Sequence, residues 1–308
     1  MKKKIKLIIK LLVTLGFLAW VILKVDWEQV LFYLGAITLW KLALYALLIV
    51  VGIGISSYKW KLLAEFKGLR HNFGDYYRFY LTGTFINNFM PSFIGGDTFK
   101  AYETGRPEKK YIEAASSVMA DRITGLIGMT ILALFFSLLN LKNVLGNHFL
   151  LLINLALALS LFLDILIAKT RNFRAWKKFL DRLPQKIARF IIEVQDYSND
   201  SGILTKAIFF GIIFQFIGVA VANFMLFWAL GIQISLFNYL SVIFLISLIS
   251  SIPISINNIG VKEWAYVTFF GIYGLDASAV VTVAILSRVI QMVISFFALP
   301  TYIKNKRT

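Results

Sequence analysis

The chain contains no cysteine and only two histidines, His71 and His148, among its 308 residues. Without thiols, disulfides, thiolate metal sites and cysteine nucleophiles are excluded. The two histidines lie far apart in the sequence, in predicted loops, so neither a histidine metal centre nor a histidine-based triad is expected. We therefore expect no metal ion and no cofactor.

The sequence is also poor in charge, and above all in acids. Charged residues make up 16% of the chain and hydrophobic residues 59%, whereas soluble domains have about 25% charged and roughly 45–50% apolar residues. No polar stretch is long enough to fold separately in water. We therefore predict one membrane domain that comprises residues 1–308.

The 16 acidic residues face 32 Lys and Arg, a net charge of +16. In a soluble protein this excess would suggest nucleic acid as a partner. Here the basic residues occupy short segments between apolar runs, as Lys and Arg do in the cytoplasmic loops of membrane proteins. No nucleic-acid partner is expected.

Six apolar runs are long enough to cross a bilayer, which takes about 20 residues in a helix. They cover residues 7–25, 37–57, 111–139, 149–168, 203–230 and 277–303. The first run follows four lysines, as in a signal peptide, but no small-residue cleavage site ends it. We predict an uncleaved first span with a cytoplasmic N-terminus, a basic cytoplasmic C-terminus, and a multi-pass protein of the cell membrane.

Two further apolar segments are interrupted by helix-breaking and polar residues. The first, 76–96, contains Asn87, Asn88, Pro91, Gly95 and Gly96, and the second, from residue 237, contains Ser250, Ser251, Pro253, Asn257, Asn258 and Gly260. Basic loops, expected on the cytoplasmic side, flank the first segment on both sides (58–75 and 100–110), which favours a hairpin that returns to the same face. The fold class is therefore an all-α polytopic membrane protein with about six spans plus two re-entrant helical hairpins, or eight spans.

The two halves of the chain follow the same order of elements. Residues 1–140 and 149–308 each comprise span, span, broken segment and span, but they start on opposite sides of the membrane. Such an inverted repeat is a common transporter architecture. Asp97 and Arg122 are 25 positions apart, and so are Glu263 and Arg288, which supports the repeat.

Residues 169–202 form a predicted cytoplasmic loop between the fourth and fifth spans. Residues 169–189 contain eight Lys and Arg against one acid, Asp181. Two sets of apolar residues each share a helical face, and Pro184 separates them: Trp176, Phe179, Leu180 and Leu183, then Ile187, Phe190, Ile191 and Val194. The pattern is typical of amphipathic helices on the inner leaflet, although an ordinary basic loop packed on the protein would show it too.

Arginine inside a spanning helix is costly, about 2.5–3.5 kcal/mol at its centre on insertion scales. Arg122 and Arg288 lie about ten residues into their spans, and Asp97, Asp121 and Glu263 are the acids available to pair with them. The arginines are either buried ion-pair members that fix helix register or contacts to a lipid headgroup. Asp97 also allows two interpretations. Its carboxylate suits a helix N-terminus, where it can cap free N–H groups. The N-terminus of a broken helix can also hold an anionic group of a substrate.

The candidate substrate-binding residues cluster at the two breaks and on the spans that follow them. They are Asn88, Pro91, Gly95, Gly96, Asp97, Lys100, Arg122, Pro253, Asn257, Gly260, Lys262, Glu263 and Arg288.

The motifs at residues 87–100 and 251–263 resemble the flippase-like membrane domain of lysylphosphatidylglycerol synthase, and the resemblance covers nearly the whole chain. The family tends to have Arg where Lys100 and Lys262 stand, so the bidentate guanidinium is replaced by a point charge. It tends to have more glycine where Ser92, Phe93, Asn257 and Asn258 stand. The resemblance implies movement of a lipid with a modified or phosphate-bearing headgroup. In two-domain relatives aminoacyl transfer belongs to a separate soluble domain, so we expect a transporter, not an enzyme.

Three functions are compatible with these patterns. The first is a lipid translocase, whose partners are lipids with an anionic or phosphate-bearing headgroup; no nucleotide-binding P-loop signature accompanies it. The second is a membrane-embedded transferase acting on a lipid-linked substrate. The third is a non-transporting partner in an envelope biosynthetic complex, which would involve a partner enzyme or a homo-oligomer.

Overall fold

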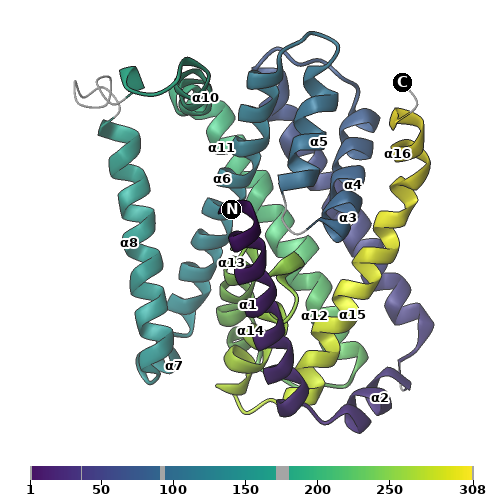
Figure 1. The fold of residues 1–308 in the computed structure, drawn as a ribbon. Coiled ribbons are helices and arrows are strands. Elements are labelled where there is room, and N and C mark those ends of the chain that lie inside the picture. Colours follow the sequence, from purple (N-terminus) through teal and green to yellow (C-terminus); the bar gives the residue numbers. More distant parts are fainter. Residues whose placement is uncertain (1, 36, 91–93, 171–179, 307–308) are drawn as a thin grey trace.

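A computed structural model describes residues 2–35, 37–90, 94–170 and 180–306, and every regular element in these ranges is helical (Figure 1). All six predicted apolar runs fall on helices. Pro91, one of the candidate site residues, and Trp176 and Phe179 of the predicted amphipathic loop lie outside the described residues.

Four helical segments are long and apolar enough to cross a membrane. They are α3 (Leu39–Phe66), α6 (Tyr111–Leu139), the continuous run of α11, η2 and α12 (Ser201–Ala229), and α15 with η4 (Ala277–Ala298). Two other segments are less regular: α1 (Lys2–Lys24) meets α2 (Trp27–Gly35) at a bend of 81° between Ile8–Lys24 and Trp27–Gly35, and α8 (His148–Thr170) has a shorter apolar part, His148–Leu163. The chain is therefore an integral membrane protein of the α-helical kind.

Each interrupted segment forms two helices that pack on one another. The first pair is α4 (Phe73–Phe89) and α5 (Ile94–Gly105), and the second is α13 (Leu236–Ser251) and α14 (Val261–Gly271), with a 3-10 turn η3 (Ile256–Asn258) between them. In Figure 1 the α5 end of the first pair lies towards the top and α14 towards the bottom.

Two predicted loop boundaries were wrong. Residues 58–66 continue α3 instead of starting a cytoplasmic loop, and α5 extends to Gly105 through the basic segment expected to begin at Lys100. The reason is the same in both places: Lys59 and Lys100 are only 3% and 6% exposed and have acidic partners, so these charges do not mark the end of a helix.

Helices from the two halves of the chain pack across one another. The second half's α13 lies along α6, and the first half's α4 lies along α15. The short helix α2 packs on α15, and α10 (Gln185–Asp196) packs on α6. The long helix α6 thus contacts α3, α5 and α11 as well as α13, and is surrounded by both halves.

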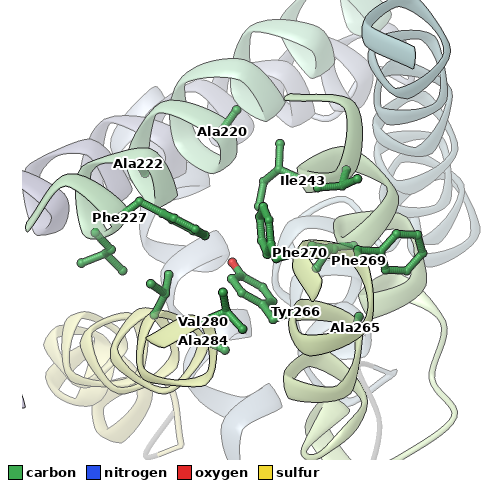
Figure 2. Close-up of a cluster of buried hydrophobic side chains, with 14 of the residues drawn as sticks. Ala220, Ala222, Phe227, Ile243, Ala265, Tyr266, Phe269, Phe270, Val280 and Ala284 are labelled. Carbon is green, nitrogen blue, oxygen red and sulfur yellow. The ribbon is translucent and has the colours of Figure 1, made fainter. Parts of the chain in front are cut away.

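Figure 2 shows the part of the largest apolar core where α12 (Ala222–Ala229), α13, α14 and α15 meet. Phe227, Tyr239 and Phe270 are fully buried there, with ring centroids 4.8–5.9 Å apart. Buried phenols need partners: the Tyr239 hydroxyl donates to the Ala220 carbonyl (2.7 Å) and the Tyr266 hydroxyl to Asn223 Oδ1 (2.9 Å). This core fixes the second hairpin on α15.

The second predicted amphipathic segment is the helix α10, and ion pairs attach it to the bundle. Lys67 Nζ lies 2.8 Å from both Glu193 Oε2 and Asp196 Oδ2, and Arg189 pairs with Glu113 of α6. The helix thus adjoins the end of α3 through its acidic residues and α6 through Arg189.

Candidate functional site

The first helix break is closed by an asparagine and a glycine. Asn87, near the end of α4, accepts a hydrogen bond from the Gly96 backbone N–H through Oδ1 (2.8 Å), which satisfies one of the free donors at the start of α5. A Cβ at residue 96 would overlap the Gly83 carbonyl oxygen of α4. Gly96 therefore allows the two helices to approach closely and carries Asp97 into the bundle.

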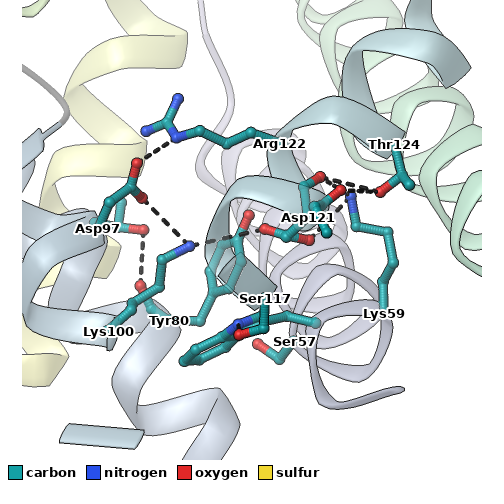
Figure 3. A network of polar contacts seen from close by, with 12 residues as sticks. Ser57, Lys59, Tyr80, Asp97, Lys100, Ser117, Asp121, Arg122 and Thr124 are labelled. Atoms are coloured by element: carbon teal, nitrogen blue, oxygen red, sulfur yellow. Dashed lines mark hydrogen bonds and ion pairs between the residues drawn. The ribbon is translucent and has the colours of Figure 1, made fainter. Parts of the chain in front are cut away.

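Five charged side chains of alternating sign extend from this break into the bundle (Figure 3). Arg122 Nε bonds Asp97 Oδ2, and Lys100 Nζ lies 3.5 Å from Asp97 Oδ1 and 3.8 Å from Asp121 Oδ2. Lys59 Nζ completes the row, 3.0 Å from Asp121 Oδ1. The side chains of Lys59, Lys100 and Asp121 are at most 7% exposed, whereas that of Arg122 is 37% exposed. The arginine is therefore the most accessible member of the row.

Aromatic rings enclose the central lysine. Lys100 Nζ lies 4.5 Å from the ring centroid of Tyr80 and 5.1 Å from that of Trp60. A ring face attracts a cation electrostatically, so these contacts stabilise the buried side chain of Lys100 in its position.

The second break is held by Arg288. Its guanidinium donates to Glu263 Oε1 through Nη2 (2.8 Å) and Nε (3.2 Å), and to the carbonyls of Asn257 (2.8 Å) and Asn258 (3.2 Å). Both asparagines have positive φ, 48° and 54°, a conformation that Asn tolerates better than most residues. Arg288 thus ties the irregular backbone of the break to α15.

Gly260 ends this break in a conformation that favours glycine. Its φ is 81°, its N–H donates to Glu263 Oε2 (2.8 Å), and a Cβ there would lie 2.6 Å from Cβ of Phe17 on α1. Thr14 of α1 also accepts the Ile256 N–H through its hydroxyl (2.9 Å). The first helix of the chain therefore braces the second break.

The two breaks differ in the groups that contact their lysine. Lys100 lies between Asp97 and Asp121, whereas Lys262 Nζ donates to the Ser287 hydroxyl (2.6 Å). Ser287 precedes Arg288 as Asp121 precedes Arg122. The first break thus has three basic and two acidic side chains, and the second has two basic and one acidic side chain, so basic side chains outnumber acidic ones by one at each break.

Two adjoining cavities open at the breaks, with volumes of about 220 and 390 Å³. The smaller is bordered by Asp97, Lys100 and Arg122, and the larger by Lys262 and Arg288. Six residues border both: Tyr80, Thr84, Met129, Phe214, Gln215 and Ser251. The cavities therefore meet at a common wall built from both halves of the chain.

The structure brings most of the predicted site residues to these cavities. Asp97, Lys100 and Arg122 border the smaller one, and Asn88, Asn257, Lys262 and Arg288 the larger. Gly95, Gly96, Pro253, Gly260 and Glu263 border neither; they belong to the breaks that shape them.

Several residues that border the cavities are missing from the candidates chosen from the sequence. Lys59 resembled the first charge of a loop, and Tyr80 and Gln215 are isolated polar residues in apolar runs. Gln215 begins the π-helical stretch Gln215–Val221, a distortion often found at functional sites. A polar residue in the middle of an apolar run was the available signal.

Within the described residues, no group of three or more His, Asp or Glu side chains could hold a metal ion. The arrangement instead offers cations, amides and hydroxyls in a partly apolar cavity. It is suited to binding an anionic group.

Comparison with known proteins identifies the family of the chain. The family model for the lysylphosphatidylglycerol synthase TM region matches residues 7–298. A UPF0104 membrane protein of Methanocaldococcus jannaschii is 25% identical over 275 residues, which cover 81% of this chain and 80% of that protein. No solved structure matches the chain. The chain belongs to the family of the lysylphosphatidylglycerol synthase transmembrane region.

Proposed function

We propose that this protein moves a lipid with a phosphate-bearing headgroup between the leaflets of the cell membrane. The observation that carries the proposal is the pair of adjoining cavities at the helix breaks, each beside a cluster in which basic side chains outnumber acidic ones by one. A fixed cation inside a membrane domain is costly unless an anion accompanies it. A phosphate passing between the cavities would be that anion.

Arg122 is the residue we assign to phosphate contact. Its Nε edge bonds Asp97, and its side chain is the most exposed of the five in the charged row. Guanidinium groups bind phosphate with charge-assisted hydrogen bonds. Arg288 also borders a cavity, but four hydrogen bonds already fix it to Glu263 and the break, so its main role is to hold the break in shape.

The packing supports an inverted repeat of residues 1–140 and 149–308. The first broken pair packs on α15 through α4, and the second packs on α6 through α13, so each pair contacts the last long helix of the other half. The short helices repeat this pattern: α2, which follows α1, packs on α15, and α10, which follows α8, packs on α6. In both halves a carboxylate at the break pairs with an arginine 25 positions later. Inverted repeats place substrate sites near the midplane between the halves and expose them alternately by rocking.

Charge distribution supports a cytoplasmic C-terminal end. In Figure 1, α10, the last helix α16 (Leu299–Lys306) and the connection between α5 and α6 lie at the same end of the molecule. That connection contains Arg106, Lys109 and Lys110, and α10 contains Lys186 and Arg189. Short basic segments remain in the cytoplasm.

We further propose that the chain is not itself an enzyme. A general base needs a carboxylate that can take a proton from the substrate. Asp97, Asp121 and Glu263 each already contact one or two cationic side chains. These ion pairs assign the carboxylates an electrostatic role, that of balancing buried cations.

Transbilayer exchange in proteoliposomes tests the proposal. Phosphatidylglycerol with a fluorescent acyl chain is incorporated, and dithionite bleaches the label only in the outer leaflet. The protein should speed loss of the inner-leaflet signal, and Arg122→Gln should slow this exchange by about tenfold or more, the equivalent of one charge-assisted hydrogen bond.

Arg78→Gln is the matched control, because Arg78 is also on a helix but its side chain is 67% exposed and borders neither cavity. Its exchange rate should equal that of the unaltered protein. Exchange no faster than in protein-free vesicles, or equal loss in both variants, would contradict the proposed function.

A further inference from the structure

We infer that two contacts between the halves of the chain close the lipid path on either side of the cavities, and that a lipid crosses when these two seals open in turn. The inference rests on the proposed function and specifies how a headgroup reaches and leaves the cavities. It depends on the kind and the position of the contacts that join residues 1–140 to residues 149–308.

The first contact, which we call the α15 seal, lies where α4 meets the end of α15. Asn88 Nδ2 donates a hydrogen bond to the Ser295 hydroxyl (2.7 Å). The ring centroid of Phe85 on α4 lies 5.4 Å from that of Phe296 and 5.8 Å from that of Tyr302. Asn88 borders the larger cavity, whereas Ser295 is fully buried and borders neither cavity. The α15 seal therefore bounds the larger cavity on the side of α16.

The second contact, which we call the α13 seal, lies where α13 meets the end of α6. Asn140 Nδ2 donates to the Ser241 hydroxyl (3.1 Å). The ring of Phe136 stacks on that of Phe244, which is fully buried, with centroids 5.7 Å apart. Met129 of α6 borders both cavities. The α13 seal therefore lies beyond the cavities, at the end of α6 that joins α7 (Leu141–Leu145).

The two seals use the same position of the proposed repeat. Phe136 follows Arg122 by 14 positions, and Tyr302 follows Arg288 by 14 positions. In Figure 1, α7 lies at the bottom of the molecule and α16 at the top. Inverted repeats place equivalent residues on opposite sides of the membrane, so one seal faces each leaflet.

The contacts in the seals are of a weaker kind than those inside each half. The ion pair of Asp97 with Arg122 joins α5 to α6, and that of Glu263 with Arg288 joins α14 to α15. The seals instead use neutral hydrogen bonds and ring contacts, and charge-assisted hydrogen bonds are roughly twice as strong as neutral ones. We therefore expect the seals to separate while each broken pair stays attached to its own half.

At the level of the cavities the two halves approach one another at backbone distance. A Cβ at Gly52 of α3 would lie 3.0 Å from the Cα of Gly218 in η2, and a Cβ at Gly128 of α6 would lie 3.1 Å from the backbone nitrogen of Ile212 in α11. Gly218 borders the larger cavity. Such dense packing transmits strain, so a rocking motion about this level opens one seal while it presses the other shut.

Reversible cross-links across each seal test the inference. The pairs are Asn88→Cys with Ser295→Cys, and Asn140→Cys with Ser241→Cys, in a chain that has no other thiol. Copper phenanthroline oxidises the two thiols to a disulfide, and mercuric ion bridges them where the sulfur atoms are too far apart to bond directly. Exchange of phosphatidylglycerol with a short fluorescent acyl chain is then followed by extraction into albumin, which needs no reductant.

Each cross-link alone should slow exchange by about tenfold or more, because alternating access needs both sides to open in turn. Dithiothreitol should restore the rate, which shows that the variants are folded. Ser295→Cys and Ser241→Cys alone are the matched controls, since neither residue borders a cavity. Each should exchange lipid equally fast before and after treatment with the same reagents.

A second pair of positions serves each seal if a reduced double variant does not exchange lipid. These pairs are Phe85→Cys with Phe296→Cys and Phe136→Cys with Phe244→Cys, joined by a bis-methanethiosulfonate linker. The expected loss and recovery of exchange are the same.

The outcomes distinguish the inference from the proposed function. Exchange that persists in both cross-linked forms would overturn the inference and leave a translocase with a permanently open groove. Loss of exchange with only one cross-link would overturn the requirement for two seals, and thiol pairs that neither reagent joins would overturn the assigned contacts. No exchange by the unaltered protein would overturn the proposed function instead.

Discussion

The buried row of charges gives a prediction that depends on its order. Asp121 contacts Lys59 at 3.0 Å and Lys100 at 3.8 Å, and all three side chains are at most 7% exposed. Replacing Asp121 by Asn leaves two ammonium groups without this carboxylate and raises the excess positive charge of the cluster. Replacing Lys59 by Met removes the excess positive charge, and Asp121 still pairs with Lys100. Asp121→Asn should therefore be the more damaging change, although both break the same ion pair.

The magnitudes follow from the burial of the pair. Removing one member of a buried ion pair costs about 3–5 kcal/mol, which we expect for Asp121→Asn. For Lys59→Met we expect about 1.5–3 kcal/mol, the value of a hydrogen bond to a charged group. The double variant should cost less than the sum of the two, because neither partner then remains alone, with a coupling of about 0.5–3 kcal/mol.

The free energy of unfolding in mixed detergent and SDS micelles measures this order. The pair Lys61–Glu65, on the same helix, is the control: its atoms are 3.6 Å apart and its side chains 25% and 41% exposed. Glu65→Gln should change stability by less than about 1 kcal/mol. If Asp121→Asn were as mild as Glu65→Gln, or milder than Lys59→Met, the assigned charge balance would be refuted.

Two further predictions concern the helix breaks. Gly96→Ala should destabilise the protein by at least about 1–3 kcal/mol, because the added methyl group overlaps the Gly83 carbonyl. The control Gly54→Ala, whose Cβ would have no atom within 4 Å, should be neutral or stabilising by up to about 1 kcal/mol. Equal sensitivity of the two variants to unfolding by SDS would contradict the close approach of α4 and α5. Arg288→Gln should lower the thermal stability of the purified protein far more than Arg122→Gln, because Arg288 bonds two backbone carbonyls at the break. Size-exclusion chromatography after heating measures the fraction of each variant that remains folded. A larger loss for Arg122→Gln than for Arg288→Gln would contradict the different roles of the two arginines.

The class of the protein and the location of its breaks follow from sequence, because both depend on local composition. Continuous apolar runs leave few alternatives to membrane helices, and a run that contains Pro91 or Gly260 cannot continue as a regular helix. The pairing of Asp97 with Arg122, and of Glu263 with Arg288, was also accessible. An arginine inside an apolar span needs a partner, and each break offers one acid.

Other features depend on contacts between distant segments and could not be predicted. Lys59 was assigned to a loop because a lysine after an apolar run usually marks the membrane surface, but its partner Asp121 lies 62 positions later. The different environments of Lys100 and Lys262 depend on whether Asp121 or Ser287 faces them. The fixed position of Arg288 depends on carbonyls exposed by a backbone turn. None of these is visible in local periodicity.

The central claim is that an anionic headgroup enters the cavity between the two breaks. Because the chain has no cysteine, Thr84→Cys would place a single thiol at the common wall of both cavities. Its rate of labelling by a polar maleimide should be lower in nanodiscs of phosphatidylglycerol than of phosphatidylcholine, and adding Arg122→Gln should remove the difference. A cysteine at exposed Asn199 should react equally in both. Labelling of residue 84 that is the same in both lipids would contradict the claim.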